Sequence, residues 1–190
     1  MVTSLNPHQA PPPPPLDVSN SLIQKLASGE ADERIRRAGA KGALPLDRAN
    51  AARSFYLLSR DPDTEIRLLL KQTRDAYEEN LLAGMAGDEA VEPAVLHFLA
   101  AACFERPRVV EEVSLNSKTS VETIQFLARR ADGDLLELIS VNEERMIHNP
   151  ALVETMLANP SLTPRVTLLL REIQIRHFGM RFDDQSLAHL

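Results

Sequence analysis

Apolar residues recur three and four positions apart along most of the chain, which is the spacing of one face of an α-helix. The first such stretch contains Leu22, Ile23 and Leu26, and Gly29 follows it as a helix stop. Asn, Asp, Pro and Gly interrupt the pattern at short intervals, so the helices are short and joined by tight turns. Beyond that first stretch we expect helices over Asp32–Ala38, Leu44–Ser59, Asp63–Gln72, Ala76–Met85, Glu92–Cys103, Arg108–Leu115, Ser120–Arg130, Asp134–Val141, Pro150–Ala158 and Thr163–His177.

A pair of helix ends recurs in the middle of the chain. Phe98-Leu99-Ala100 is repeated as Phe126-Leu127-Ala128 after 28 residues, and Val113–Asn116 is repeated as Ile139–Asn142 after 26 residues. Self-similarity at such a period is typical of solenoids, whose units stack because one unit cannot bury its apolar face alone. The pattern predicts an all-α fold, a short α-solenoid of antiparallel helix pairs.

Two kinds of turn carry a resemblance to known repeat families. The segment Asp61-Pro62-Asp63 leads into a helix with Ile66 and Arg67, and is similar to the turn inside HEAT-type repeats. We expect Asp61 to cap this helix and Pro62 to take its first position. The steps Asn149-Pro150 and Asn159–Pro164 resemble the corner of leucine-rich repeat variant proteins.

The resemblance covers Leu44–Ile173 and implies a right-handed α-α superhelix. Leucine-rich repeat variant proteins can also carry a cysteine-ligated iron–sulfur module. The chain contains a single cysteine, Cys103, so this module is not expected. Cys103 lies in an apolar run, and we expect it to be a buried side chain rather than a reactive thiol.

Composition divides the chain into three regions. Residues 1–16 contain the unbroken run Pro11–Pro15 and are expected to form a disordered proline-rich leader or a stiff spacer. A proline run can also be a ligand for an aromatic-lined groove. Residues 17–178 are expected to form the helical repeat domain, and residues 179–190 a C-terminal tail or a cap over the last repeat.

The net charge of −6 is unevenly distributed. Residues 17–74 carry 11 basic and 8 acidic side chains, whereas residues 75–116 carry 2 basic and 9 acidic ones. An acidic chain repels phosphate backbones, so we do not expect nucleic acid as a partner. No apolar stretch is long enough to cross a bilayer. The lone cysteine fits a cytoplasmic location.

The sequence lacks the patterns of catalytic and cofactor sites. There is no Gly-x-Ser-x-Gly motif, no glycine-rich phosphate loop and no i, i+4 pair of histidines. The pairs Glu78-Glu79, Glu111-Glu112 and Glu143-Glu144 diverge by about 100° on a helix, so they suit a solvated surface better than an acid–base pair. We therefore assign no catalytic, cofactor-binding or metal-binding residue.

The remaining candidate for function is the surface of the second helix in each pair, because these helices commonly line the binding side of a solenoid. We expect a non-catalytic interaction module or scaffold that binds a protein or peptide partner. The alternatives are a structural protein that self-associates through its C-terminal end, and an enzyme or regulatory subunit of the HEAT-like type. The candidate binding residues are Arg67, Lys71, Arg108, Glu111, Glu112, Glu137 and Arg165.

Overall fold

The computed structural model describes residues 15–179, and every regular element within them is an α-helix. The all-α prediction is therefore confirmed. Most of the predicted leader and tail, residues 1–14 and 180–190, lies outside the described residues. The helices are α1 (Ser21–Ser28), α2 (Glu33–Ala40), α3 (Arg48–Leu58), α4 (Thr64–Ala76), α5 (Glu79–Ala86), α6 (Pro93–Ala102), α7 (Pro107–Leu115), α8 (Val121–Ala128), α9 (Gly133–Ser140), α10 (Glu143–Ile147), α11 (Pro150–Leu157) and α12 (Pro164–Phe178).

Short polar side chains set where most helices begin. Asp32, Asp47, Ser120 and Thr163 each precede a helix and accept a hydrogen bond from a backbone N–H three residues later. Such caps satisfy amide groups that have no partner inside the helix. Proline occupies the first turn of α6, α7, α11 and α12, where its missing N–H costs nothing. These signals are why most predicted boundaries agree with the structure to within two residues.

The predicted start of α3 and the predicted cap of α4 are wrong. Helix α3 begins at Arg48 rather than Leu44, because Asp47 caps it. Helix α4 begins at Thr64, capped by Asp63, so Pro62 is not its first residue. The Asp61 carboxylate instead accepts a bond from the Asp63 N–H at 2.9 Å and pairs with Arg36 at 2.7 Å.

Two further helices differ from the prediction. Ala76 ends α4 rather than starting the next helix, and α5 begins at Glu79. The sequence pattern did not predict α10, whose five residues are too few to show a periodicity. Helix α10 is capped by Asn142, which accepts a bond from the Arg145 N–H.

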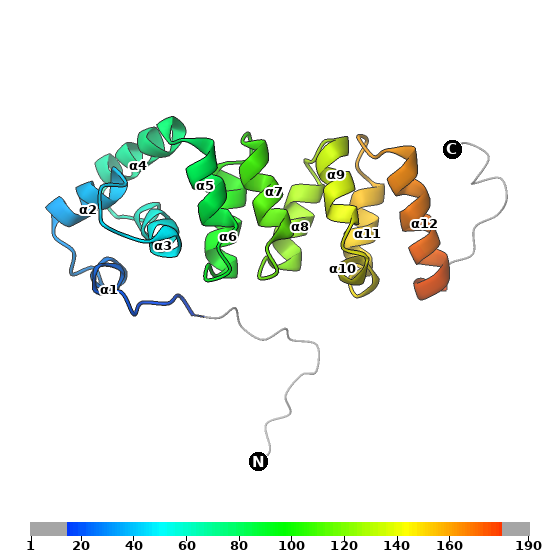
Figure 1. Cartoon of the computed structure of the whole chain (residues 1–190), viewed down its shortest axis with the longest axis horizontal. Coiled ribbons are helices and arrows are strands. Elements are labelled where there is room, and N and C mark those ends of the chain that lie inside the picture. The colour runs from blue at the N-terminus through cyan, green and yellow to red at the C-terminus, as the bar shows by residue number, and fades with distance from the viewer. Residues whose placement is uncertain (1–14, 180–190) are drawn as a thin grey trace, which may run out of the picture.

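From α3 onward, most helices form two rows along an elongated molecule (Figure 1). Helices α3, α6, α8 and α11 contact one another in order, and α5, α7, α9 and α12 do the same. The pairs α6 and α7, α8 and α9, and α11 and α12 connect the rows. Contacts are thus mostly between neighbouring helices, and the two ends of the molecule lie far apart.

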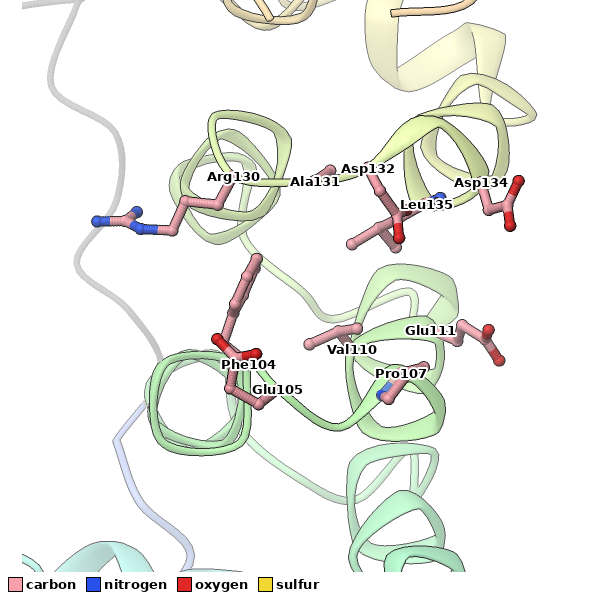
Figure 2. Close-up of a pocket in the computed structure, with 10 residues that line it drawn as sticks. All are labelled: Phe104, Glu105, Pro107, Val110, Glu111, Arg130, Ala131, Asp132, Asp134 and Leu135. Atoms are coloured by element: carbon pink, nitrogen blue, oxygen red, sulfur yellow. Dashed lines mark hydrogen bonds between the residues drawn. The ribbon is translucent and has the colours of Figure 1, made fainter. Parts of the chain in front are cut away.

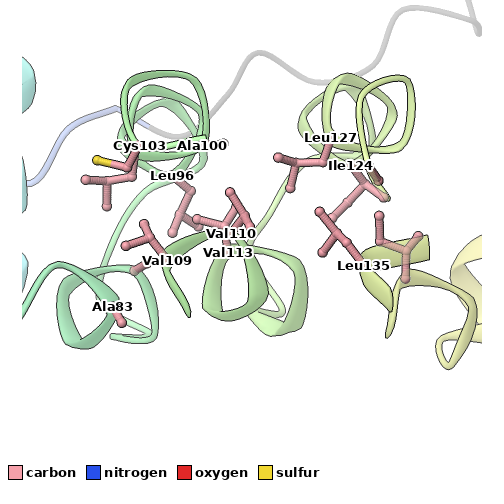
Figure 3. Packing of buried hydrophobic residues seen from close by; sticks show 14 of the residues in the cluster. Ala83, Leu96, Ala100, Cys103, Val109, Val110, Val113, Ile124, Leu127 and Leu135 are labelled. Atoms are coloured by element: carbon pink, nitrogen blue, oxygen red, sulfur yellow. The ribbon is translucent and has the colours of Figure 1, made fainter. Parts of the chain in front are cut away.

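The core lies between the two rows. Buried side chains of α6, α7 and α8 point toward one another there (Figure 3). Leu96 and Leu99 of α6, Val109 and Val113 of α7, and Leu127 of α8 all have no exposed surface. Burying each such side chain contributes about 1.5–3 kcal/mol. Cys103 lies at the edge of this cluster and is 4% exposed, as predicted.

A buried ion pair links α3, in the N-terminal part of the fold, to the start of α6. The Arg53 guanidinium on α3 donates to the Glu92 carboxylate just before α6, at 3.0 and 3.1 Å. It also donates to Asn50 at 3.0 Å and to the carbonyl of Ala90. The Asp17 backbone N–H donates to the same carboxylate at 2.7 Å. Arg53 and Glu92 are 3% and 7% exposed, so this charge pair is shielded from water.

Two asparagine corners have the same construction. Asn116 follows α7 and donates through its amide to the carbonyls of Ala86 and Asp88, 30 and 28 residues earlier. Asn159 follows α11 and donates to the carbonyls of Ala128 and Ala131, 31 and 28 residues earlier. In both corners the asparagine oxygen accepts the N–H two residues later, and a Ser or Thr caps the next helix. Each corner therefore joins one helix pair to the preceding one.

Candidate functional site

The candidate residues predicted on α4 lie apart from the others. Helix α4 packs on α2 and α3, and it is α5 that adjoins α7 in the second row. Arg67 is half-buried and donates to the carbonyls of Asp61 and Pro62 and to the Thr64 hydroxyl. Its guanidinium therefore stabilises the turn that leads into α4. Lys71 is exposed on α4. The structure therefore does not bring these two cations to the predicted binding face.

The other candidates lie in the second row, but most of them face different neighbours. Arg108 faces α5, where its guanidinium donates to Asn80 and its N–H donates to the Glu79 carboxylate at 3.0 Å. The Glu112 carboxylate lies beside Gly87, the residue that follows the last residue of α5. Glu137 accepts a bond from Thr163 at 3.2 Å. Arg165 is exposed in the first turn of α12.

Glu111 is the candidate that borders a cavity. Between the pairs α6–α7 and α8–α9 there is an open cavity of about 350 Å³ (Figure 2). Phe104, Val110 and Leu135 form its apolar wall. Glu111 and Asp134 lie on its outer side, where both side chains point to solvent in Figure 2. The remaining lining residues are Glu105, Pro107, Arg130, Ala131 and Asp132.

A second cavity of about 400 Å³ lies at the other end of the same two helices. Leu115, at the end of α7, is 59% exposed, and Val141, just after α9, is 75% exposed. Glu143 and Glu144 of α10 line the far side of this cavity. Two large aliphatic side chains thus lie in water beside a pair of carboxylates.

The two cavities lie along the same two helices, α7 and α9, and share no lining residue. Glu111 and Leu115 are one helical turn apart on α7, and Asp134 and Leu138 are one turn apart on α9. Each helix therefore presents a carboxylate in one cavity and an aliphatic side chain in the next. We call this surface the α7–α9 groove. Its lining comprises the residues of both cavities.

The charge of the α7–α9 groove is strongly negative. Six carboxylates line it, and none forms an ion pair with another residue in the range 15–179. They are Glu105, Glu111, Asp132, Asp134, Glu143 and Glu144.

Both arginines of the groove are engaged by the protein itself. Arg130 lies over the Phe126 ring, 4.3 Å from its centre. Arg145 donates to the Ser114 carbonyl at 3.0 Å, and burial lowers the pKa of its guanidinium. The two arginines still offset two of the six carboxylates, so the lining keeps a formal charge of −4.

Other chemistry is sparse in the part of the chain that the structure describes. There, no group of three or more His, Cys, Asp or Glu side chains could hold a metal ion. His97 lies 3.0 Å from the Thr123 hydroxyl and packs edge-on against Phe126. Among these residues, no helix is long and apolar enough to span a membrane.

No protein-family model, no curated protein and no solved structure matches this chain. The groove itself is therefore the main indication of function in this chain. Of the predicted binding residues, Glu111 lines this groove, and the other lining residues were not among those predicted. The available signal was the spacing of a carboxylate four positions before a leucine, Glu111 before Leu115 and Asp134 before Leu138, on two consecutive second helices.

Proposed function

We propose that this chain is a non-catalytic interaction module, and that its helices form a short α-solenoid of the HEAT-like or leucine-rich repeat variant kind. The two rows of helices support the solenoid, since each helix contacts its counterparts in the adjacent pairs. The Asp61–Arg67 turn and the corners at Asn116 and Asn159 support the family likeness. The proposal places the protein in the cytoplasm, where the buried Cys103 thiol stays reduced.

The observation that carries the function is the α7–α9 groove. Leu115 and Val141 line the same cavity at exposures of 59% and 75%, and an exposed apolar cluster rimmed by polar residues is typical of an interaction site. Glu143 and Glu144 line the same cavity, and four more carboxylates line the other one. Such charges speed the approach of an oppositely charged partner and disfavour partners of like charge. Within this proposal the groove holds a segment of a protein or peptide partner, and it needs no cofactor.

The experiment is affinity capture from the native cell, with the full chain as bait. The matched variant is Leu115→Ser/Val141→Ser, which removes the two exposed aliphatic groups without changing the charge. Both positions are exposed, so the variant keeps its fold, which circular dichroism checks. A partner that the native chain captures and the variant loses supports the groove. A partner captured equally by both contradicts it.

A second candidate function is self-association through α12. Leu168 and Ile175 are two turns apart on one face of α12 and are 55% and 48% exposed. Two exposed aliphatic side chains on the last described helix lie where a further repeat or a second copy would stack. Sedimentation at increasing concentration tests this candidate. A mass that rises for the native chain and not for Leu168→Ser/Ile175→Ser would favour it.

A further inference from the structure

We propose that the α7–α9 groove binds an extended protein segment with the pattern basic–x–apolar–x–basic, and this rests on the proposed function of the groove. The cationic residues of the segment contact the two acidic ends of the groove. The apolar residue packs between them on Leu115 and Leu138. The partner is therefore recognised by the spacing of its charges as well as by their sign.

The order of side chains along the groove sets this pattern. Glu111 and Asp134 lie at one end, Leu115 and Leu138 follow one helical turn later, and the α10 carboxylates come last. One turn of α-helix advances about 5.4 Å, so Leu115 and Leu138 follow the first carboxylates by about that distance. Glu143 and Glu144 line the same cavity as these two leucines and supply the second acidic end.

An extended chain matches these steps. It advances about 3.3 Å per residue, and alternate side chains point to the same face. Residues one, three and five of an extended segment are therefore about 6.6 Å apart on one face. They meet an acidic end, the aliphatic centre and the second acidic end in turn. A helical segment would need its two cations roughly nine residues apart to span the same length, at about 1.5 Å per residue.

Charge selects the class of partner. The six carboxylates carry no ion pair within residues 15–179, and both groove arginines are occupied by protein groups. A basic segment gains Coulomb attraction at both ends, whereas an acidic segment or a phosphate backbone is repelled. The chain's own residues 1–14 contain no Lys or Arg, so they lack the chemistry of this occupant.

The test measures binding of labelled peptides to the full chain by fluorescence anisotropy at low salt. The probe is Gly-Gly-Lys-Ser-Leu-Ser-Lys-Gly-Gly. One control peptide has the same composition with adjacent lysines, and a second has glutamate in place of both lysines. We expect the probe to bind, the permuted peptide to bind about fivefold more weakly, and the acidic peptide not to bind. Raising the salt concentration weakens binding of the probe.

Matched variants place the peptide on the groove. Glu111→Gln/Asp134→Asn and Glu143→Gln/Glu144→Gln neutralise the two ends separately, and each should weaken binding about fivefold. Glu122→Gln/Glu154→Gln removes two exposed carboxylates from α8 and α11 in the other row and should leave binding unchanged. Equal binding of all three peptides, or equal loss in all three variants, would overturn the proposal.

The result is separable from a failure of the proposed function. A native partner lost by Leu115→Ser/Val141→Ser but retained by both charge-neutralised variants would leave the binding module standing and overturn the basic segment. A partner lost by the aliphatic variant and by either charge variant supports both. If none of the peptides binds the native chain, the basic–x–apolar–x–basic pattern is wrong, whatever the capture experiment shows.

Discussion

At the scale of single residues, this fold depends on side chains that satisfy backbone groups at corners. Asn116 and Asn159 stand 43 residues apart, yet each bonds two carbonyls of an earlier helix end. The sequence indicated that asparagines lie at the breaks between helices. It did not distinguish these two, which are buried, from Asn142, which is exposed and caps α10. Burial depends on the packing of neighbouring pairs, and one residue type gives no signal for it.

Replacing Asn116 with alanine should destabilise the fold by about 2–3 kcal/mol. The substitution removes three hydrogen bonds and leaves the carbonyl of Ala86 buried without its amide partner. Asn142→Ala is the matched control, because it removes only a helix cap and should cost about 0.5–1 kcal/mol. Urea unfolding followed by circular dichroism measures both values. Equal losses would mean that the corner contributes no more than a cap.

The Cys103 thiol should be slow to react and should make stability fall at alkaline pH. Burial raises the pKa of Cys103 in the folded chain. The protonated thiol contributes its full stabilisation to the fold below the ordinary thiol pKa of ~8.5. This stabilisation declines as the pH rises toward the pKa of the folded chain, because the thiol of the unfolded chain ionises first. We expect the urea midpoint to drop more between pH 7.5 and pH 9.5 in the native chain than in Cys103→Ala. Rapid labelling of the native thiol at pH 7.5 would contradict its burial.

At the scale of helices, capping signals explain why boundaries were predictable and why some were wrong. Four helices start at a proline in their first turn, and each of those was placed to within one residue. Around Asp61 the sequence offers two acidic caps two residues apart, and local chemistry does not choose between them. The choice is tertiary, because Arg36 on α2 takes the Asp61 carboxylate and leaves Asp63 to cap α4.

The Arg53–Glu92 pair should be the most sensitive polar contact between helices. Glu92→Ala leaves the buried guanidinium with only the exposed Asp17 carboxylate, 3.7 Å away, and should cost about 3–5 kcal/mol in the free energy of unfolding. The double variant Arg53→Met/Glu92→Leu removes both charges and should recover a large part of that loss, because no unpaired charge stays buried. Thermal unfolding of the three proteins measures this coupling.

The control for this pair is Arg37→Ala. Arg37 bonds Glu33 and Glu65 at the surface, at 2.7 and 2.9 Å, where water screens the charges. We expect its melting temperature to stay close to that of the native chain. If Arg37→Ala lowers the melting temperature as much as Glu92→Ala does, burial is not the reason that the Arg53–Glu92 pair stabilises the fold.

At the scale of the whole molecule, the site emerges from packing between repeats. The apolar periodicity predicted the helices. The recurring sequence at the ends of two helices, residues 98–100 and 126–128, predicted how the helices pair. The α7–α9 groove was not predictable in the same way, because its lining comes from α7, α9, α10 and three loops. The unpredicted α10 supplies one acidic end. Arg67 and Lys71 were placed on the binding face because α4 was taken as a second helix in the same row as α7, where α5 lies instead.

Contacts between neighbouring helices should make stability local rather than uniform. In such an array the free energy is approximately a sum over units and their interfaces, so damage at one end spreads weakly. Leu170 is fully buried in α12, and Leu170→Ala should cost about 2–5 kcal/mol. Hydrogen exchange followed by mass spectrometry should then show faster exchange in α9, α11 and α12, with α2, α3 and α4 unchanged.

The reciprocal variant completes the test. Phe55 is 1% exposed in α3 and packs edge-on against Tyr77, with ring centres 5.6 Å apart. Phe55→Ala should speed exchange in α2, α3 and α4 and leave α11 and α12 protected, because no direct contact joins these ends. If either substitution accelerates exchange equally in all helices, the chain unfolds as one cooperative unit. The elongated arrangement would then describe its shape without governing its stability.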